Sequence, residues 1–104
     1  MDRVFEALAS SARRQILAYL HAGELTAGEI GERFEFSKPA LSNHLRILED
    51  AGLIVREKRG QFVYFRQVPE RLANTLVSWA AEVCPLAGPL KRESKARARG
   101  KQGA

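Results

Sequence analysis

The 104-residue sequence predicts a mainly α-helical fold with one β-hairpin, in the order helix, helix, helix, helix, hairpin, helix. Three observations lead to this order. Apolar residues recur at helical spacing in five segments. Two runs rich in β-branched and aromatic residues, LIVREK and QFVYFRQV, flank a short Arg-Gly turn. Several of the helical segments also start on serine, threonine or proline, residue types that favour the first turn of a helix.

The first three helices are expected in the segments RVFEALAS, ARRQILAYLH and LTAGEIGERF. Ser10 or Ser11 is the expected N-cap of the second helix, and His21 in its last turn suits the helix dipole. Thr26 and Glu29 stand three residues apart, which is the spacing of a capping box at the start of the third helix. The inward-facing positions are Val4, Phe5, Leu8, Ile16, Leu17, Leu20, Ile30 and Phe34.

The fourth helix is expected over residues 37–51. Ser37 is its expected N-cap, Pro39 fits its first turn, and Gly52 follows its end. Leucines at positions 41, 45 and 48 define its buried face. The opposite face carries short polar and cationic side chains, with few acids before Glu49. This composition suits close contact with a polar surface that has grooves.

Cations gather on the predicted hairpin. Gly60 is expected to supply a positive φ at the turn, with Lys58 and Arg59 at the turn itself. The cations of the hairpin are Arg56, Lys58, Arg59 and Arg66, and its single acid is Glu57. The hairpin is therefore expected to be basic and exposed.

The last helix is expected in PERLANTLVSWAAEV, beginning at Pro69. Its inward-facing set is Leu72, Leu76, Val77, Trp79, Ala80 and Val83. We expect one folded domain over residues 1–84 and a basic, disordered tail over residues 85–104, because the tail is too rich in charge, proline and glycine to pack a core. Residues 91–104 hold six basic residues and one acid, which accounts for the whole net charge of +5. The tail either follows a polyanion or only solubilises the chain.

The composition argues against several other classes of protein. A hydrophobic content of 45% supports one small core. Cys84 is the single cysteine, so no intrachain disulfide or cysteine cluster is expected. No apolar run is long enough for a signal peptide or a membrane span, so a cytoplasmic protein is expected. No Ser-His-Asp or Cys-His set and no phosphate loop is apparent, so neither an enzyme nor a cofactor is expected.

The third and fourth helices are separated by only a few residues before Ser37, so they must cross steeply, as in a helix-turn-helix. The second helix of that motif presents its N-terminal half to bases in the major groove. Asn43 suits adenine, Lys38 and Arg46 suit guanine or phosphate, and Ser42 is adaptable. A basic hairpin beside this pair is typical of a wing that touches phosphate or the minor groove. The order therefore predicts a winged helix-turn-helix that binds double-stranded DNA.

The segments VFEALASSARRQILAYL and LTAGEIGERFEFSKPALSNHLRILEDAGLIVREKRGQFVYFRQV resemble the ArsR/SmtB family of bacterial winged-helix repressors, most distinctively in LSNHLRILEDAGL. The resemblance covers roughly residues 3–83. It implies a homodimer, built largely from the first and last helices, that represses transcription at a palindromic operator. It assigns recognition positions to Ser37, Lys38, Ala40, Ser42 and Asn43, with wing contacts from Lys58, Arg59 and Gln61.

The sequence departs from the metal-sensing members of that family. Those members carry cysteines in the third helix, where this chain has Thr26, Ala27 and Gly28. Others place Asp and His ligands on the last helix, where this chain offers only Glu82. Because zinc needs about four ligands, two histidines and one cysteine do not supply a site of the family type. No metal site is expected, and the chain looks like an autorepressor branch of the family.

The candidate DNA-binding residues are Ser37, Lys38, Ala40, Ser42, Asn43, His44, Arg46, Lys58, Arg59 and Gln61. His44 either contacts DNA or bonds nearby backbone, and its place beside the buried face favours the structural role. Arg13 and Arg14 either touch the DNA backbone or form a solvated face. The candidate dimer-interface residues are Val4, Phe5, Leu8, Leu72, Leu76, Trp79 and Val83. Trp79 fits a dimer core better than an effector pocket.

Two functional hypotheses follow. The leading one is a sequence-specific transcriptional regulator, a repressor that binds a palindromic operator as a homodimer. The alternative is a winged-helix interaction module that binds protein or RNA without reading bases. The polar, uncharged face over residues 40–43 favours base readout, because a protein-docking face would show aromatic side chains.

Overall fold

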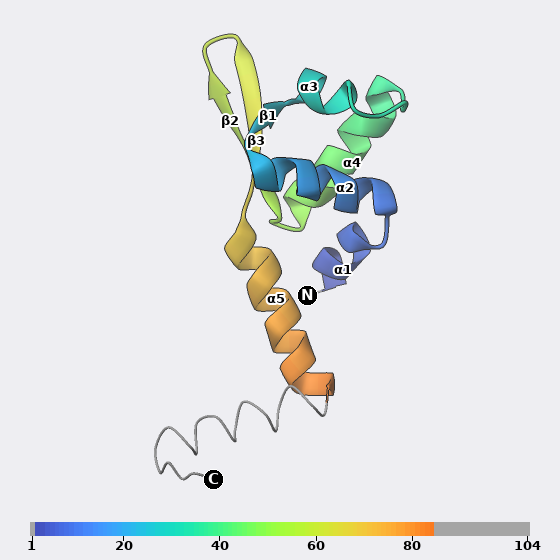
Figure 1. Cartoon of the computed structure of the whole chain (residues 1–104), viewed down its shortest axis with the longest axis vertical. Coiled ribbons are helices and arrows are strands. Elements are labelled where there is room, and N and C mark those ends of the chain that lie inside the picture. Colours follow the sequence, from blue (N-terminus) through green and yellow to red (C-terminus); the bar gives the residue numbers. More distant parts are fainter. Residues whose placement is uncertain (1, 85–104) are drawn as a thin grey trace. The chain divides into compact units, whose positions relative to one another are not determined.

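The computed structural model describes residues 2–84 (Figure 1). Its elements are α1 (Asp2–Leu8), α2 (Ser11–Ala22), β1 (Leu25–Thr26), α3 (Ala27–Gly31), α4 (Lys38–Asp50), β2 (Ile54–Arg59), β3 (Phe62–Gln67) and α5 (Pro69–Val83). This order confirms the predicted mainly α fold with one hairpin. The chain divides after Leu72 into two units. The expected basic tail, residues 85–104, lies outside the described residues.

Capping side chains start the helices where the sequence predicts. Ser10 caps α2 by accepting a hydrogen bond from the backbone N–H of Arg13. At α3 the backbone N–H of Glu29 donates to Thr26 Oγ1, and the backbone N–H of Thr26 donates to Glu29 Oε1, which completes the capping box. Ser37 caps α4 in the same way as Ser10 caps α2. These local bonds fix where each helix begins.

The three strands form an antiparallel sheet in the order β1-β3-β2. Paired residues of neighbouring antiparallel strands project to the same face of the sheet. The outer face of the hairpin therefore carries Val55, Glu57, Arg59, Phe62, Tyr64 and Arg66, and its inner face carries Ile54, Arg56, Lys58, Val63, Phe65 and Gln67. The inner face covers the core, because Ile54 and Phe65 are buried.

One hydrophobic core lies within the unit that ends at Leu72. Its buried residues are Val4, Ala7, Ile16, Leu17, Leu20, Ile30, Leu41, Leu45, Leu48, Ala51, Leu53, Ile54 and Phe65. The three leucines of α4 confirm the predicted buried face of that helix. Because they hold one side of α4 against the core, the opposite side faces solvent.

The third helix is shorter than predicted. The sequence suggested a helix within residues 25–34, capped by Thr26. The cap is confirmed, and Leu25 and Thr26 also form β1, which pairs with β3. Because Thr26 is the N-cap, the residue before it lies outside the helix. The helix ends at Gly31, and Phe34 packs against the core from the turn that follows.

The hairpin turn is also tighter than predicted. Strand β2 begins at Ile54 rather than Leu53 and continues to Arg59, which pairs with Phe62. Lys58 and Arg59 therefore belong to the strand and not to the turn. Gly60 supplies the expected positive φ of 63°, and a two-residue loop leaves no room for more turn residues.

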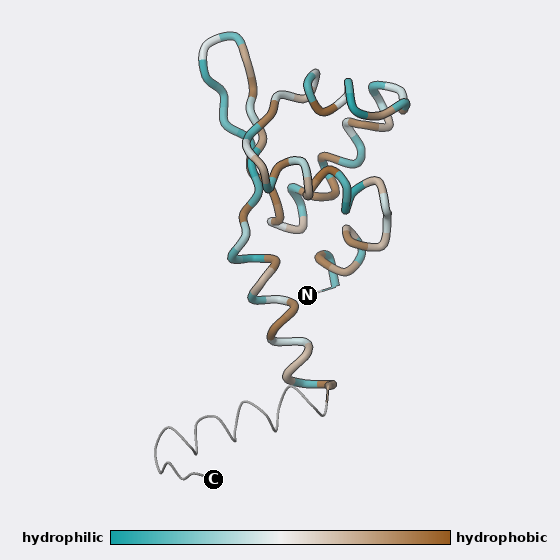
Figure 2. Tube along the Cα trace, viewed as in Figure 1, coloured by the Kyte–Doolittle hydropathy of each residue, from teal (hydrophilic) through white to brown (hydrophobic). Residues whose placement is uncertain are grey.

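Helix α5 begins at Pro69 as predicted, but its apolar side is not inward in the described chain. None of its residues is buried. Leu76, Val77, Trp79 and Val83 are exposed, and Leu72, in the other unit, is half-buried against the core. Hydrophobic positions recur along the helix among hydrophilic ones (Figure 2). The helix is thus amphipathic, and its large apolar side chains are exposed rather than buried.

Candidate nucleic-acid interface

The N-terminal half of α4 presents a polar surface to solvent. Lys38, Ser42 and Asn43 are exposed and Ala40 is half-buried. The first acidic residue of the helix is Glu49, so this half carries no negative side chain. The partial positive charge of the helix N-terminus adds to that of Lys38, which makes no ion pair with any described residue. Such a surface can donate hydrogen bonds to base edges and to phosphate oxygens.

Asn43 and Arg46 are bonded to each other. Arg46 Nη2 donates to Asn43 Oδ1 over 2.6 Å, and Arg46 Nη1 lies 3.6 Å from Asp50 Oδ2. The Asn43 amide keeps both N–H donors, and its oxygen can accept a second bond. Arg46 therefore orients the Asn43 side chain through this hydrogen bond. Asp50 balances part of the positive charge that Arg46 would present to DNA. Exposed pairs of this kind are weak and exchange readily.

His44 lies half-buried on the flank of α4. Its Nδ1 is 3.2 Å from Arg13 Nη1, and its ring centre is 5.0 Å from that of Phe36. Burial first, and the charge of Arg13 second, lower the pKa of His44 below its ordinary value. These contacts fit the structural role that its position favoured, although its partners are side chains rather than nearby backbone.

Arg13 and Arg14 close the C-terminus of α1. Arg13 donates from Nε to the carbonyl oxygen of Ala7 over 2.8 Å and from Nη2 to that of Glu6 over 3.0 Å. Arg14 Nη1 donates to the carbonyl oxygen of Leu8. The carbonyls of the last turn of a helix lack partners further along that helix, and these bonds satisfy them, beside the backbone bond from Ala9 N–H to the Glu6 oxygen. These bonds give both arginines a structural role in addition to the two sequence-based alternatives, a DNA contact or a solvated face, which stay predictions.

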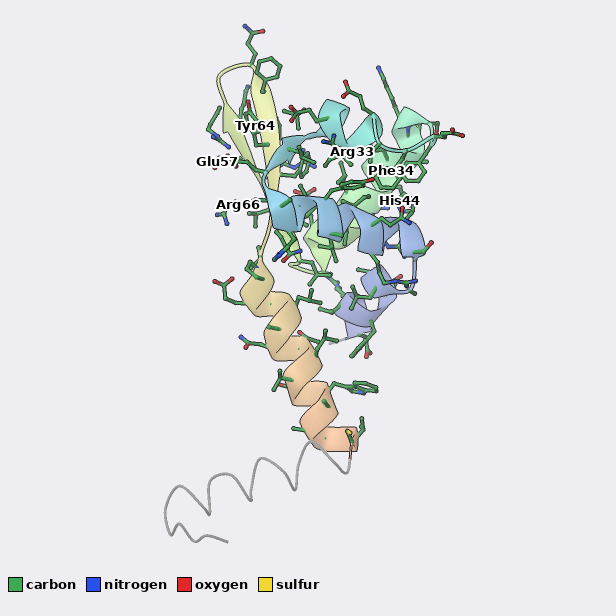
Figure 3. The ribbon with its side chains drawn as sticks, viewed as in Figure 1. Arg33, Phe34, His44, Glu57, Tyr64 and Arg66 are labelled. Carbon is green, nitrogen blue, oxygen red and sulfur yellow. The ribbon has the colours of Figure 1, made fainter. Side chains whose placement is uncertain are left out.

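Aromatic rings hold the turn between α3 and α4. Phe34 and Phe36 stack with centroids 4.7 Å apart, and Tyr19 of α2 meets Phe34 edge-on at 5.7 Å. The guanidinium of Arg33 lies over the Tyr19 ring at 5.3 Å. Figure 3 shows Arg33, Phe34 and His44 gathered around α3 and α4. This cluster sets the angle between the two helices.

A bidentate ion pair ties the hairpin to α4. Arg56 donates from Nε to Glu49 Oε2 over 2.8 Å and from Nη2 to Glu49 Oε1 over 2.7 Å. The same guanidinium lies 5.1 Å from the ring centre of Phe65. The Glu49 carboxylate raises the pKa of Arg56. The charge of Arg56 is therefore used inside the protein, and the wing is fixed relative to α4.

A second ion pair holds the hairpin from its outer face. Arg59 Nη2 bonds to Glu24 Oε2 in the segment between α2 and β1, and its guanidinium lies 4.2 Å from the ring centre of Tyr64. The hydrogen bond from Arg59 lowers the pKa of Glu24. Glu57 approaches the same guanidinium at 3.9 Å. Figure 3 shows Glu57, Tyr64 and Arg66 along the hairpin. Arg59 thus positions the wing through contacts inside the protein, and a DNA contact by this residue stays a prediction.

The remaining polar groups of the wing tip point to solvent. Lys58 and Gln61 are exposed, and Lys58 has no ion-pair partner within residues 2–84. At the base of the hairpin, Gln67 Nε2 donates to the carbonyl oxygen of Leu17 over 2.9 Å and joins β3 to α2. The wing is anchored at its base, and its tip is free to make contacts.

The candidate dimer residues differ in their exposure. Val4 is 3% exposed and belongs to the core of its own chain, which leaves little of its surface for a partner. Phe5 and Leu8 are half-buried. On α5, Trp79 is 45% and Val83 54% exposed. The apolar surface available to a second chain is therefore concentrated on α5.

Sequence reasoning missed the roles of three residues that shape this site. Glu24 and Glu49 anchor the two sides of the wing, and Arg13 joins α1 to α4 through His44. Nothing local marks them, since each partner lies in another element.

Among residues 2–84 no group of three or more His, Cys, Asp or Glu side chains is arranged to hold a metal ion. Within the same range, no helix is long and apolar enough to cross a membrane.

A helix-turn-helix followed by a two-stranded wing, with a recognition helix whose N-terminal half carries no acid, is typical of a DNA-binding transcription regulator. The family model described as "Helix-turn-helix domain" matches residues 8–57. The transcriptional repressor SdpR of Bacillus subtilis is 46% identical over 65 residues, which cover 62% of this chain and 72% of SdpR. The arsenic resistance transcriptional regulator ArsR1 of Pseudomonas putida is 40% identical over 68 residues, 64% of this chain but only 53% of that protein.

Solved structures agree with the sequence comparison. The crystal structure of an ArsR family transcriptional regulator superposes with a TM-score of 0.71 at 31% identity, covering 78% of this chain and 88% of the other. The chain belongs to the ArsR family of winged helix-turn-helix transcription regulators. It is a DNA-binding regulator and not an enzyme. The comparisons confirm the ArsR-family resemblance that the sequence analysis stated.

Proposed function

We propose that the chain is a homodimeric repressor that reads an inverted-repeat operator in double-stranded DNA. The observation that carries this proposal is the exposed, acid-free N-terminal half of α4, capped by Ser37 and held in place by its leucine face. Repression is supported by the similarity to a protein named as a transcriptional repressor. Winged helix-turn-helix dimers place two such helices in successive major grooves, about one helical turn apart.

Asn43 has the leading role in base recognition. Its amide nitrogen donates to a base acceptor while its oxygen accepts from an adenine amino group, in addition to or in place of Arg46. Lys38 and Ser37, in the first turn, bind the phosphates beside the same base pairs. Lys58 and Gln61 reach the DNA from the wing, and Ser42 and Ala40 permit close approach of the helix.

The second chain of the dimer covers α5. Leu76, Val77 and Val83 expose large apolar surfaces along that helix, and such surface is costly to leave in water. A twofold dimer buries the same surface of both chains and matches an inverted repeat. Phe5 and Leu8 of α1, both half-buried, are the interface residues proposed for the unit that ends at Leu72.

The test is selection from random duplex DNA with the purified protein, followed by titration of the best site. Enrichment of one inverted repeat supports a dimeric reader. Asn43→Ala is expected to weaken operator binding about tenfold or more, with little change on random DNA. Asn74→Ala, an exposed asparagine on α5, is the matched control and is expected to bind as the wild type does. Equal losses of Asn43→Ala on both DNAs would contradict base reading at this position.

A further inference from the structure

The wing tip exposes an aromatic side chain that the proposed readout by α4 does not use. Phe62 is the first residue of β3 and pairs with Arg59 at the end of the hairpin. It is 58% exposed, the highest value among the exposed large hydrophobic side chains of residues 2–84. Phe65, three residues later, is 3% exposed and belongs to the core. A single exposed apolar residue is common, so the surroundings of Phe62 decide what it does.

The cation opposite Phe62 does not cover its ring. Arg59 is drawn to Glu24, and its guanidinium lies over Tyr64 instead. No ring or cation contact of Phe62 with another described residue is present. The ion pair between Arg59 and Glu24 therefore has two effects: it fixes the hairpin, and it leaves an uncovered aromatic ring at the tip.

The groups around Phe62 match the minor groove of DNA. Lys58 lies on the inner face one residue pair from the tip, Gln61 lies in the turn, and both are exposed. In the minor groove the walls are apolar sugars, the rims are anionic phosphates, and the floor carries hydrogen-bond acceptors. The Phe62 ring suits the apolar walls, the Gln61 amide suits the acceptors on the floor, and the Lys58 ammonium group suits the phosphates of the rims. Strand β2 is hydrophilic and β3 begins with hydrophobic residues (Figure 2), so the tip is amphipathic.

We propose that the Phe62 ring enters the minor groove beside each operator half-site and disfavours guanine there. The inference rests on the proposed function, because α4 must first seat the wing over that groove. Guanine is the base that places an amino donor in the minor groove. An aromatic ring against that amino group leaves its N–H without a partner, whereas A·T pairs present no such donor. Apolar wedges of this kind are a known way for proteins to bind the minor groove.

The experiment uses operator duplexes whose flanking pairs, located by footprinting, are G·C, inosine·C or A·T. Inosine lacks only the minor-groove amino group, so the major-groove edge is unchanged. Wild-type protein is expected to bind the inosine duplex about tenfold more tightly than the G·C duplex. Phe62→Ala is expected to lose this preference while its dependence of affinity on salt stays the same, since no phosphate contact is removed. Phe62→Leu is expected to keep part of the preference.

Val55→Ala is the matched control, because Val55 lies on the same outer face near the base of the hairpin and is 37% exposed. It is expected to retain the full preference for inosine. A Phe62→Ala protein that keeps the preference overturns the inference. So does a Phe62→Ala protein whose sedimentation shows a changed oligomeric state, since the ring would then face a second chain. Wild-type protein that binds the selected operator no better than random DNA overturns the base reading by α4 instead.

Discussion

Arg13 and His44 meet across 31 positions of sequence, with Arg13 Nη1 3.2 Å from His44 Nδ1. Because a guanidinium has only donors, Nδ1 accepts the bond, and the proton of the neutral imidazole is assigned to Nε2. The same guanidinium binds two carbonyl oxygens at the end of α1. One side chain therefore joins α1, α2 and α4, and the flank of the recognition helix depends on the helix that starts the chain.

The stability of the fold should depend on pH through His44. Burial and the charge of Arg13 lower the pKa of His44 from its ordinary value of 6.5, so the unfolded chain takes up this proton at a higher pH than the folded chain. The free energy of unfolding should then fall as pH drops through 6.5 toward the lowered pKa, and no further below it. Urea unfolding of wild type and His44→Gln between about pH 8 and about pH 5 measures this contribution.

The control for this prediction is His21→Gln, which removes the other histidine. It should show the same fall in stability with acid as the wild type, whereas His44→Gln should show a smaller one. If all three proteins lose stability in parallel, the pH dependence arises elsewhere.

Removal of the α4 cap should affect both stability and DNA binding. Ser37→Ala loses the hydrogen bond from the backbone N–H of Ala40 and should cost about 1 kcal/mol of unfolding free energy. Ser10→Ala loses the equivalent bond at α2 and should cost a similar amount. Only Ser37→Ala should also weaken operator binding, measured by fluorescence anisotropy at equal folded fraction. Equal binding by the two variants would argue that the first turn of α4 does not reach DNA.

Breaking the link between the wing and α4 should matter more for binding than for folding. Glu49→Gln removes one partner of the bidentate pair with Arg56. The Arg56 side chain is well exposed, so the loss of unfolding free energy should stay below about 1 kcal/mol. Operator affinity should fall about fivefold, because the wing is no longer fixed against the recognition helix. Glu57→Gln, which affects a longer exposed contact on the outer face, should leave affinity nearly unchanged.

The glycines differ in their tolerance of a side chain. Gly52 has φ of 77°, and a Cβ there would lie 3.1 Å from Cζ of Arg71. Gly60 has φ of 63° in open space. Gly60→Ala should cost about 1 kcal/mol through the backbone alone, and Gly52→Ala more, since Arg71 must also move. Gly23→Ala, with extended φ and open space, should be nearly neutral. Thermal unfolding ranks the three, and a different order would contradict this account.

Local signals predicted most of the fold. The capping box at Thr26, the cap at Ser37 and the glycines at 52 and 60 each depend on residues a few positions apart, so the sequence displays them directly. Strand β1 was missed because it is two residues long and exists only through pairing with β3. The length of α3 was overestimated because Phe34 continues the helical spacing after the helix has ended.

The candidate site could be predicted less completely. The acid-free stretch of α4 is visible as composition, and it led to Lys38, Ser42 and Asn43. The partners of the cations are not visible, because Glu24 and Arg59 lie far apart in the chain and meet only in the folded protein. Counting charges on the hairpin therefore overestimated how many are available to DNA.

Thr26 belongs to two structures at once. It pairs with Tyr64 in the sheet, and it caps α3 through its hydroxyl. A displacement of the hairpin therefore pulls on the first turn of α3, and unwinding of that turn releases the hairpin. Thr26 therefore couples the order of the wing to that of α3. A chain from which the hairpin is deleted should lose order in α3 as well.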